Sequence, residues 1–66
     1  MKNRIKELRE QLDLTQIDLG KALEVSRQTV ISLENGRYNP SLPLAHKIAK
    51  VFSRTIEEVF IFEEEE

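Results

Sequence analysis

Helix-start signals recur along this sequence at short intervals, and they limit the chain to short helices. Serine and threonine are favoured at helix N-caps because their side-chain oxygens accept hydrogen bonds from the free amides of the first turn. An acid follows three residues after two of the threonines, as in a capping box, in which the acid bonds back to the cap. We therefore expect helices to begin at Thr15, Ser26, Ser41 and Thr55.

Apolar residues recur between these signals at spacings of three and four, as they do on one face of a helix. Gly36 is placed to end the third helix, and Pro43 is tolerated in the first turn of the fourth. The pattern predicts an all-α, compact five-helix domain, with residues 59–62 open to a short C-terminal β-strand. The helices are expected over residues 3–11, 16–23, 26–35 and 41–52, and for about a turn and a half after Thr55. The inward stripe of the first helix is expected to be Ile5, Leu8 and Leu12, and that of the fourth Leu44, Ile48, Val51 and Phe52. The apolar positions of the second helix are Ile17, Leu19 and Leu23, and Val30 and Leu33 lie on the third.

Composition permits several functions and selects none of them. The 66 residues suffice for one domain, and the absence of cysteine excludes disulfides and thiolate metal sites. No apolar run approaches the roughly 20 residues of a membrane span, and no secretion signal is present, which predicts a cytoplasmic protein.

The net charge of −2 includes four glutamates at residues 63–66, so residues 1–62 are mildly basic. We divide the chain accordingly into a domain of residues 1–62 and an acidic tail of residues 63–66.

The turn between the second and third predicted helices is very short. The second helix is expected to end at Leu23, and the next capping signal is Ser26. A short helix, a turn of three to four residues and a second helix form the geometry in which the later helix enters the major groove of DNA. As a bare pattern this is a weak signal, because many helical hairpins are purely structural.

The residues on the third helix strengthen the signal. At about 100° per residue, Val30 and Leu33 share one face of this helix. The opposite face combines an arginine, a glutamine, an aliphatic side chain and a small hydroxyl, and it carries no acid. These groups suit guanine, adenine and thymine edges in the major groove. The candidate base-reading residues are therefore Arg27, Gln28, Ile31 and Ser32.

Four segments carry a resemblance to a known family: residues 14–16, residues 19–20, residues 25–30 and residues 33–36. Together, Leu14-Thr15-Gln16, Leu19-Gly20, Val25-Ser26-Arg27-Gln28-Thr29-Val30 and Leu33-Glu34-Asn35-Gly36 resemble the helix-turn-helix of the phage lambda repressor family, also called the xenobiotic response element family. The resemblance extends over residues 6–60. It implies a lambda repressor-like fold and a transcriptional regulator that binds double-stranded DNA.

The resemblance also implies a set of DNA backbone contacts. Gln16 and Asn35 would hold phosphates, and for Gln16 the helix N-terminus adds favourable dipole and amide donors. Arg37, Tyr38 and Asn39 follow the third helix in a loop that family members hold against the backbone, and their donors suit that role. The alternatives are an exposed helix-forming residue for Gln16 and plain loop residues for the other three.

Glu34 is an acid near the end of the predicted reading helix, where it would repel phosphate. Such a residue needs a compensating partner. In the family a basic residue of the first helix pairs with this acid, so the resemblance implies a structural ion pair between Arg9 and Glu34.

One such domain reads only a handful of base pairs, so we expect a two-fold homodimer on a palindromic operator. Phe60, Ile61 and Phe62 exceed what a small core requires and are the candidate dimer interface. The alternative is that these side chains complete the core of the monomer.

No catalytic constellation is present in the sequence. His46 has no second histidine, cysteine or carboxylate at a defensible ligand spacing, which argues against a metal site or any cofactor. The chain is therefore predicted to be a regulator, with repression as its expected mode, and not an enzyme. Two other classes remain: an antitoxin-type interaction module that also binds its own operator, and a purely structural helical bundle.

Overall fold

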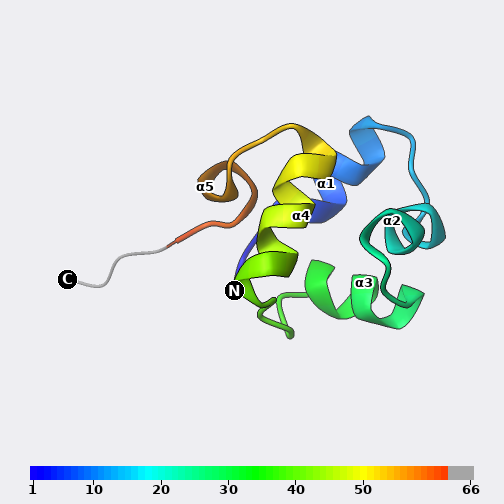
Figure 1. The fold of residues 1–66 in the computed structure, drawn as a ribbon, viewed down its shortest axis with the longest axis horizontal. Coiled ribbons are helices and arrows are strands. Elements are labelled where there is room, and N and C mark those ends of the chain that lie inside the picture. The colour runs from blue at the N-terminus through cyan, green and yellow to red at the C-terminus, as the bar shows by residue number, and fades with distance from the viewer. Residues whose placement is uncertain (63–66) are drawn as a thin grey trace.

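The computed structural model describes residues 1–62, and these residues form five short helices joined by tight turns (Figure 1). The predicted all-α, five-helix architecture is confirmed. The helices are α1 (Ile5–Gln11), α2 (Gln16–Leu23), α3 (Arg27–Glu34), α4 (Leu42–Phe52) and α5 (Ile56–Val59).

All four predicted N-caps are formed. The side-chain oxygens of the caps accept hydrogen bonds from the backbone amides three residues further along, at 2.9 to 3.3 Å. Both capping boxes are also complete, with the acid accepting from the backbone N–H of its cap at 3.0 Å in α2 and 2.8 Å in α5. The four caps are Thr15, Ser26, Ser41 and Thr55.

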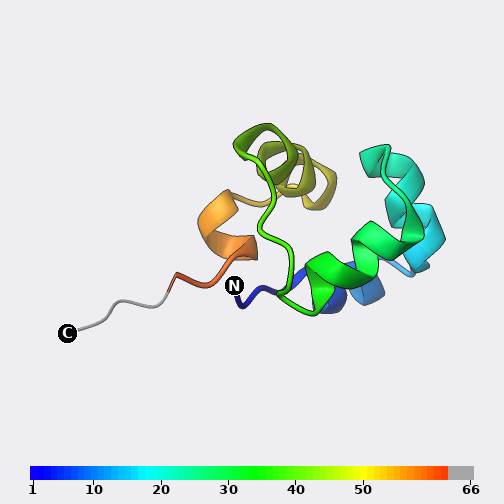
Figure 2. The ribbon, with the colours of Figure 1, turned by 90° about the horizontal axis from the view of Figure 1, so that it is seen from below.

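The core lies between α4 and the helices around it. α2 packs against both α3 and α4, α1 contacts α3, and α5 closes the other side of α4. Figures 1 and 2 show α5 at one end of the molecule and the α2–α3 pair at the other. The core cluster consists of Ile5, Leu8, Leu19, Leu23, Val30, Leu33, Ala45, Ile48, Phe52, Val59 and Phe60.

Two apolar residues of the first two predicted helices are exposed. Leu12 is 52% exposed because α1 ends at Gln11, and the chain turns at Asp13, whose φ is +58°. Ile17 is 54% exposed because it lies about 200° around α2 from Leu19, which is fully buried. The expectation that Leu12 faces inward was therefore wrong.

The first helix starts later than expected, and residues 59–62, which the sequence left open to a short strand, do not form one. Asn3 makes an isolated antiparallel bridge with Phe60, so residues 3 and 4 pair with the C-terminal segment and are not helical. Val59 belongs to α5, and within residues 1–62 no strand is present. The acidic tail of residues 63–66 lies outside the described residues. Among the helices of residues 1–62, none combines the length and apolarity needed to cross a membrane.

Candidate nucleic-acid interface

A close approach between α2 and α3 makes their short connection possible. Glu24 adopts a left-handed conformation, with φ of +62°, and the Val25 amide donates to the carbonyl oxygen of Gly20 at 2.9 Å. A Cβ atom at Gly20 would lie only 2.8 Å from the carbonyl oxygen of Val25. The absence of a side chain at this position therefore allows α3 to begin directly beside α2.

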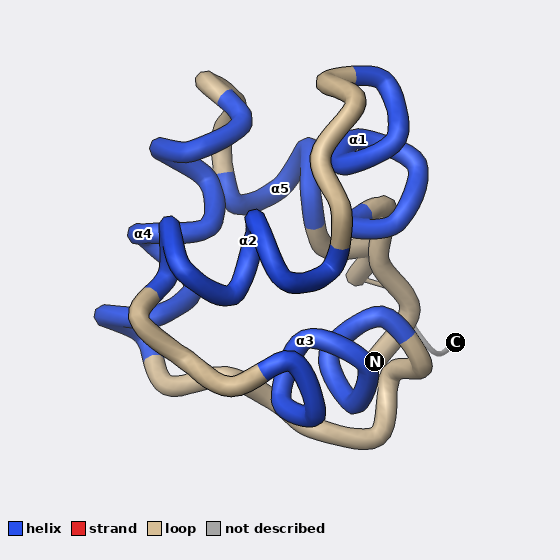
Figure 3. The backbone as a smooth tube through the Cα atoms, turned by 90° about the vertical axis from the view of Figure 1, so that its right-hand side faces the viewer, coloured by secondary structure: helices blue, strands red, loops and turns tan. Residues whose placement is uncertain are grey.

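The two faces of α3 differ as the sequence predicts. Val30 and Leu33 are fully buried, whereas Arg27 and Gln28 are exposed at the start of the helix. Figure 3 shows α3 at the edge of the molecule, with α2 crossing on its inner side. The outer side of α3 is thus accessible to a large partner.

Ile31 and Ser32 lie one turn further along α3 and are half-buried. They are less accessible than Arg27 and Gln28, which lie in the first turn. A partner has to approach the middle of α3 closely to contact either side chain.

The outer face of α3 continues into the loop that follows it. A shallow groove of about 300 Å³ is lined by Gln28, Thr29 and Ser32 of α3 and by Arg37 and Tyr38 of the loop. The structure therefore brings two candidate base-reading residues together with two candidate backbone contacts. Thr29 also lines this groove, although its sequence pattern pointed to no role. Its position next to Gln28 in the first turn of α3 is the feature of the sequence that could have indicated this.

The remaining backbone candidates are dispersed. Asn35 is exposed at the C-cap of α3. Asn39 lies outside this groove and lines a different, apolar one together with Pro40 and Leu42. Gln16 is half-buried in the first turn of α2, where its amide nitrogen Nε2 donates to Glu34 Oε1 at 3.2 Å.

The Glu34 carboxylate of α3 accepts hydrogen bonds from two other helices, from Gln16 of α2 and from Arg9 of α1. Arg9 Nε of α1 donates to Glu34 Oε2 of α3 at 2.6 Å, so the expected ion pair is present in the structure. A second guanidinium nitrogen of Arg9 donates to the Leu14 carbonyl oxygen at 2.7 Å. The side chains of Arg9 and Glu34 are 10% and 5% exposed. The charge of the acid is therefore compensated inside the protein.

The expected dimer-interface residues lie in different environments. Phe60 is 3% exposed and belongs to the core of the single chain, which is the alternative that the sequence left open for this residue. Ile61 is half-buried, and Phe62 is 57% exposed. Of the three, Phe62 is the one with a largely free surface.

The described residues contain no group of three or more histidines, cysteines and acids that could hold a metal ion. The candidate interface instead consists of hydrogen-bonding and charged side chains on the outer face of α3 and in the loop that follows it.

Comparison with known proteins agrees with this geometry. A helix-turn-helix family model matches residues 5–59. The chain is 56% identical over 66 residues to an uncharacterised HTH-type transcriptional regulator of Methanocaldococcus jannaschii, and it covers all of both chains. It is 54% identical to one from Archaeoglobus fulgidus, covering 100% of this chain and 93% of that relative. It is 52% identical to YgzD of Bacillus subtilis, also an HTH-type regulator, covering 98% of each. The chain therefore belongs to the lambda repressor-like helix-turn-helix family of DNA-binding transcriptional regulators.

Proposed function

We propose that this protein is a cytoplasmic, dimeric repressor that reads a palindromic operator with the outer face of α3. In this proposal the base-reading residues are Arg27, Gln28, Ile31 and Ser32. The residues that hold the DNA backbone are Gln16, Asn35, Arg37, Tyr38 and Asn39.

The observation that carries the proposal is the groove between α3 and its loop. Gln28 and Ser32 contribute hydrogen-bonding groups to the lining of this groove, and Arg37 and Tyr38 contribute a cation and a phenol. Base readout requires donors and acceptors on a helix that fits the major groove, and register requires phosphate contacts beside it. Both kinds of group adjoin the same groove in this protein.

Each reading residue has a distinct chemical role in the proposal. The amide of Gln28 offers a donor and an acceptor together, as adenine requires, and the guanidinium of Arg27 suits guanine O6 and N7. Ile31 is half-buried and supplies an apolar surface for a thymine methyl group. Ser32, also half-buried, reaches only a base that α3 approaches closely.

The dimer is proposed at an apolar groove on the side of α4 and α5. Leu42 is 74% exposed, Phe62 57% and Met1 46%, and all three line this groove of about 260 Å³. Exposed apolar side chains gathered in one place are typical of a protein interface. Two-fold dimers of helix-turn-helix proteins read half-sites about 34 Å apart, and this is the spacing that we propose for the operator.

Binding to duplex DNA at increasing salt tests the proposed function without knowledge of the operator. If phosphates are held by Arg37 and its neighbours, the logarithm of the affinity falls linearly with the logarithm of salt concentration. The slope is about −0.9 for each phosphate neutralised. Absence of binding to any duplex at low salt would contradict the proposal.

A further inference from the structure

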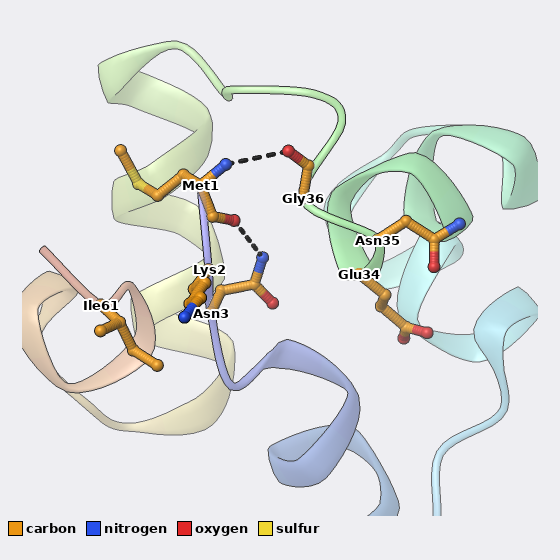
Figure 4. Close-up of a pocket in the computed structure, with 7 residues that line it drawn as sticks. All are labelled: Met1, Lys2, Asn3, Glu34, Asn35, Gly36 and Ile61. Carbon is orange, nitrogen blue, oxygen red and sulfur yellow. Dashed lines mark hydrogen bonds between the residues drawn. The ribbon is translucent and has the colours of Figure 1, made fainter. Parts of the chain in front are cut away.

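The N-terminal residues contact the C-terminal end of α3. Met1, Lys2 and Asn3 line a pocket together with Glu34, Asn35, Gly36 and Ile61 (Figure 4). The backbone nitrogen of Met1 donates to the carbonyl oxygen of Gly36 at 2.9 Å. Segments thirty or more residues apart in the sequence thus meet where the proposed reading helix ends.

The side chain of Asn3 connects two helix ends. Its Oδ1 accepts from the Ile5 amide at 3.0 Å and so supplies the side-chain cap that Arg4 does not give α1. Its Nδ2 donates to the Leu33 carbonyl oxygen of α3 at 2.8 Å and to the Met1 carbonyl oxygen at 3.3 Å. An asparagine amide has one acceptor oxygen and two donor hydrogens, so the acceptor and a donor of Asn3 serve different helices.

Backbone hydrogen bonds attach the same residues to the C-terminal segment. The Arg4 amide donates to the Val59 carbonyl oxygen at 2.8 Å, and the Ile61 amide donates to the Lys2 carbonyl oxygen at 2.9 Å. These bonds flank the bridge between Asn3 and Phe60. The N-terminal segment therefore has the C-terminal segment on one side and α3 on the other.

The end of α3 is shaped for this contact. Gly36 has φ of +74°, its amide donates to Leu33, and the Arg37 amide donates to Ser32, which together form a Schellman ending. A Cβ atom at position 36 would lie 2.8 Å from the carbonyl oxygen of Met1. A side chain at this position would push the N-terminal segment away even if the backbone tolerated it.

We infer that Asn3 is a positioning residue for DNA reading: it fixes the C-terminal end of α3 relative to α5 and the C-terminal segment. The inference rests on the proposed reading by α3. It also links reading to dimerisation, because Phe62, in the proposed interface, follows Ile61 directly. In a dimer, the contact made by Asn3 would help to set the distance between the two reading helices.

Asn3→Asp is the sharpest variant. It keeps an oxygen to accept from Ile5 and preserves the cap of α1, but it places a second oxygen against the carbonyl oxygens of Leu33 and Met1. Loss of one such hydrogen bond corresponds to about a three- to tenfold change in an equilibrium. The ratio of affinities for a duplex selected from a random library by the wild type and for its scrambled version should fall by that factor.

Two controls separate positioning from other effects. Gln11→Glu adds the same negative charge at an exposed position on α1, and Ile48→Val destabilises the buried core without touching the end of α3. Hydrogen exchange without DNA supplies an independent measurement. In Asn3→Asp, the Gly36 and Arg37 amides should exchange several-fold faster relative to the amides of α4.

The inference is supported if both effects exceed those of the two controls. It is overturned if Asn3→Asp discriminates duplexes as well as Gln11→Glu does, or if its exchange rises evenly along the chain as in Ile48→Val. If the wild type prefers no duplex over its scrambled version, the proposed function fails. The exchange measurement then still decides whether Asn3 holds the end of α3.

Discussion

Arg37 and Arg54 are both exposed arginines, but only Arg37 adjoins the groove beside α3. A backbone contact positions the protein without specifying sequence. We therefore expect Arg37→Ala to weaken binding to all duplexes by a similar factor and to reduce the salt slope by about 1. Fluorescence anisotropy at several salt concentrations measures both quantities. Arg54→Ala is the control for the lost charge, and an equal effect of the two variants would count against a contact at Arg37.

Arg9 and Glu34 form a nearly buried ion pair, so the charge of each side chain is compensated by the other. Removing one partner leaves an uncompensated charge, whereas removing both leaves none. We expect Arg9→Ala and Glu34→Ala each to lower the free energy of unfolding by about 3 kcal/mol, and the double variant to lose less than either single one. Urea denaturation of the four proteins gives the coupling. Additive losses would show that the pair contributes little, and loss of DNA binding at unchanged stability would assign Glu34 to a different role.

Among the features of the helices, the sequence predicted those that are set by residues close together in the chain, namely the N-caps and the two faces of α3. Each N-cap bonds to an amide three residues away, so Thr15, Ser26, Ser41 and Thr55 could be identified without the fold. The same holds for the outer face of α3, since helical periodicity alone separates Gln28 from the buried Val30 and Leu33.

What the sequence did not predict depends on distant contacts. Asn3 was expected in the first helix, but its partners lie 30 residues away in α3 and 57 residues away at Phe60. Leu12 lies four residues after Leu8 and was expected on the inward face of the first helix, but α1 ends at Gln11 and Leu12 is exposed. The split between Phe60, in the core, and Phe62, at the surface, likewise follows from how α5 packs on α4.

The capping boxes make the stability of the helices depend on pH. Hydrogen bonds from the Thr15 backbone and hydroxyl lower the pKa of Asp18, and the Thr55 backbone N–H does the same to the pKa of Glu58. A lowered pKa means that these carboxylates stabilise the fold above their unfolded-state values, near pH 4. That contribution is lost as the pH falls through the lower folded-state values.

We therefore expect the melting temperature to decrease on acidification below about pH 4. Asp18→Asn can still accept from the Thr15 amide but does not titrate, so its melting temperature should decrease less steeply with pH. Thermal melts followed by circular dichroism at about ten pH values between about pH 2 and pH 6 give the melting temperatures of the wild type and of Asp18→Asn for comparison. Parallel pH profiles would rule out a contribution from this box.

At the scale of the whole molecule, membership of a non-enzymatic family of regulators confirms the prediction that the protein is not an enzyme. Truncation of the C-terminal segment is unsuited to testing the proposed dimer. Removal of all residues after Glu58 would delete Val59 and Phe60, both of which are buried in the core. A point variant at the exposed Phe62 leaves that core intact.

Phe62→Ser should shift the protein toward monomers, because it removes an exposed apolar side chain from the groove shared with Leu42. Sedimentation velocity without DNA measures the shift. Ile17→Ser is the matched control, since Ile17 is 54% exposed on α2 and lies outside this groove. An unchanged dimer in Phe62→Ser, or equal dissociation in Ile17→Ser, would place the interface elsewhere.

Gln28 is the side chain of α3 that we expect to make the main contact with a base, so its removal tests whether the outer face of α3 reads base sequence. Duplexes should be selected from a random library by the wild type and by Gln28→Ala, with Gln11→Ala as the control for loss of an exposed glutamine. We expect the wild type to select two symmetric half-sites about 34 Å apart. Gln28→Ala should lose preference at one base-pair position in each half-site and bind the wild-type site about 1–3 kcal/mol more weakly. If Gln28→Ala instead weakens binding to selected and scrambled duplexes equally and keeps every base preference, then Gln28 does not read the sequence and the proposed reading by α3 is wrong.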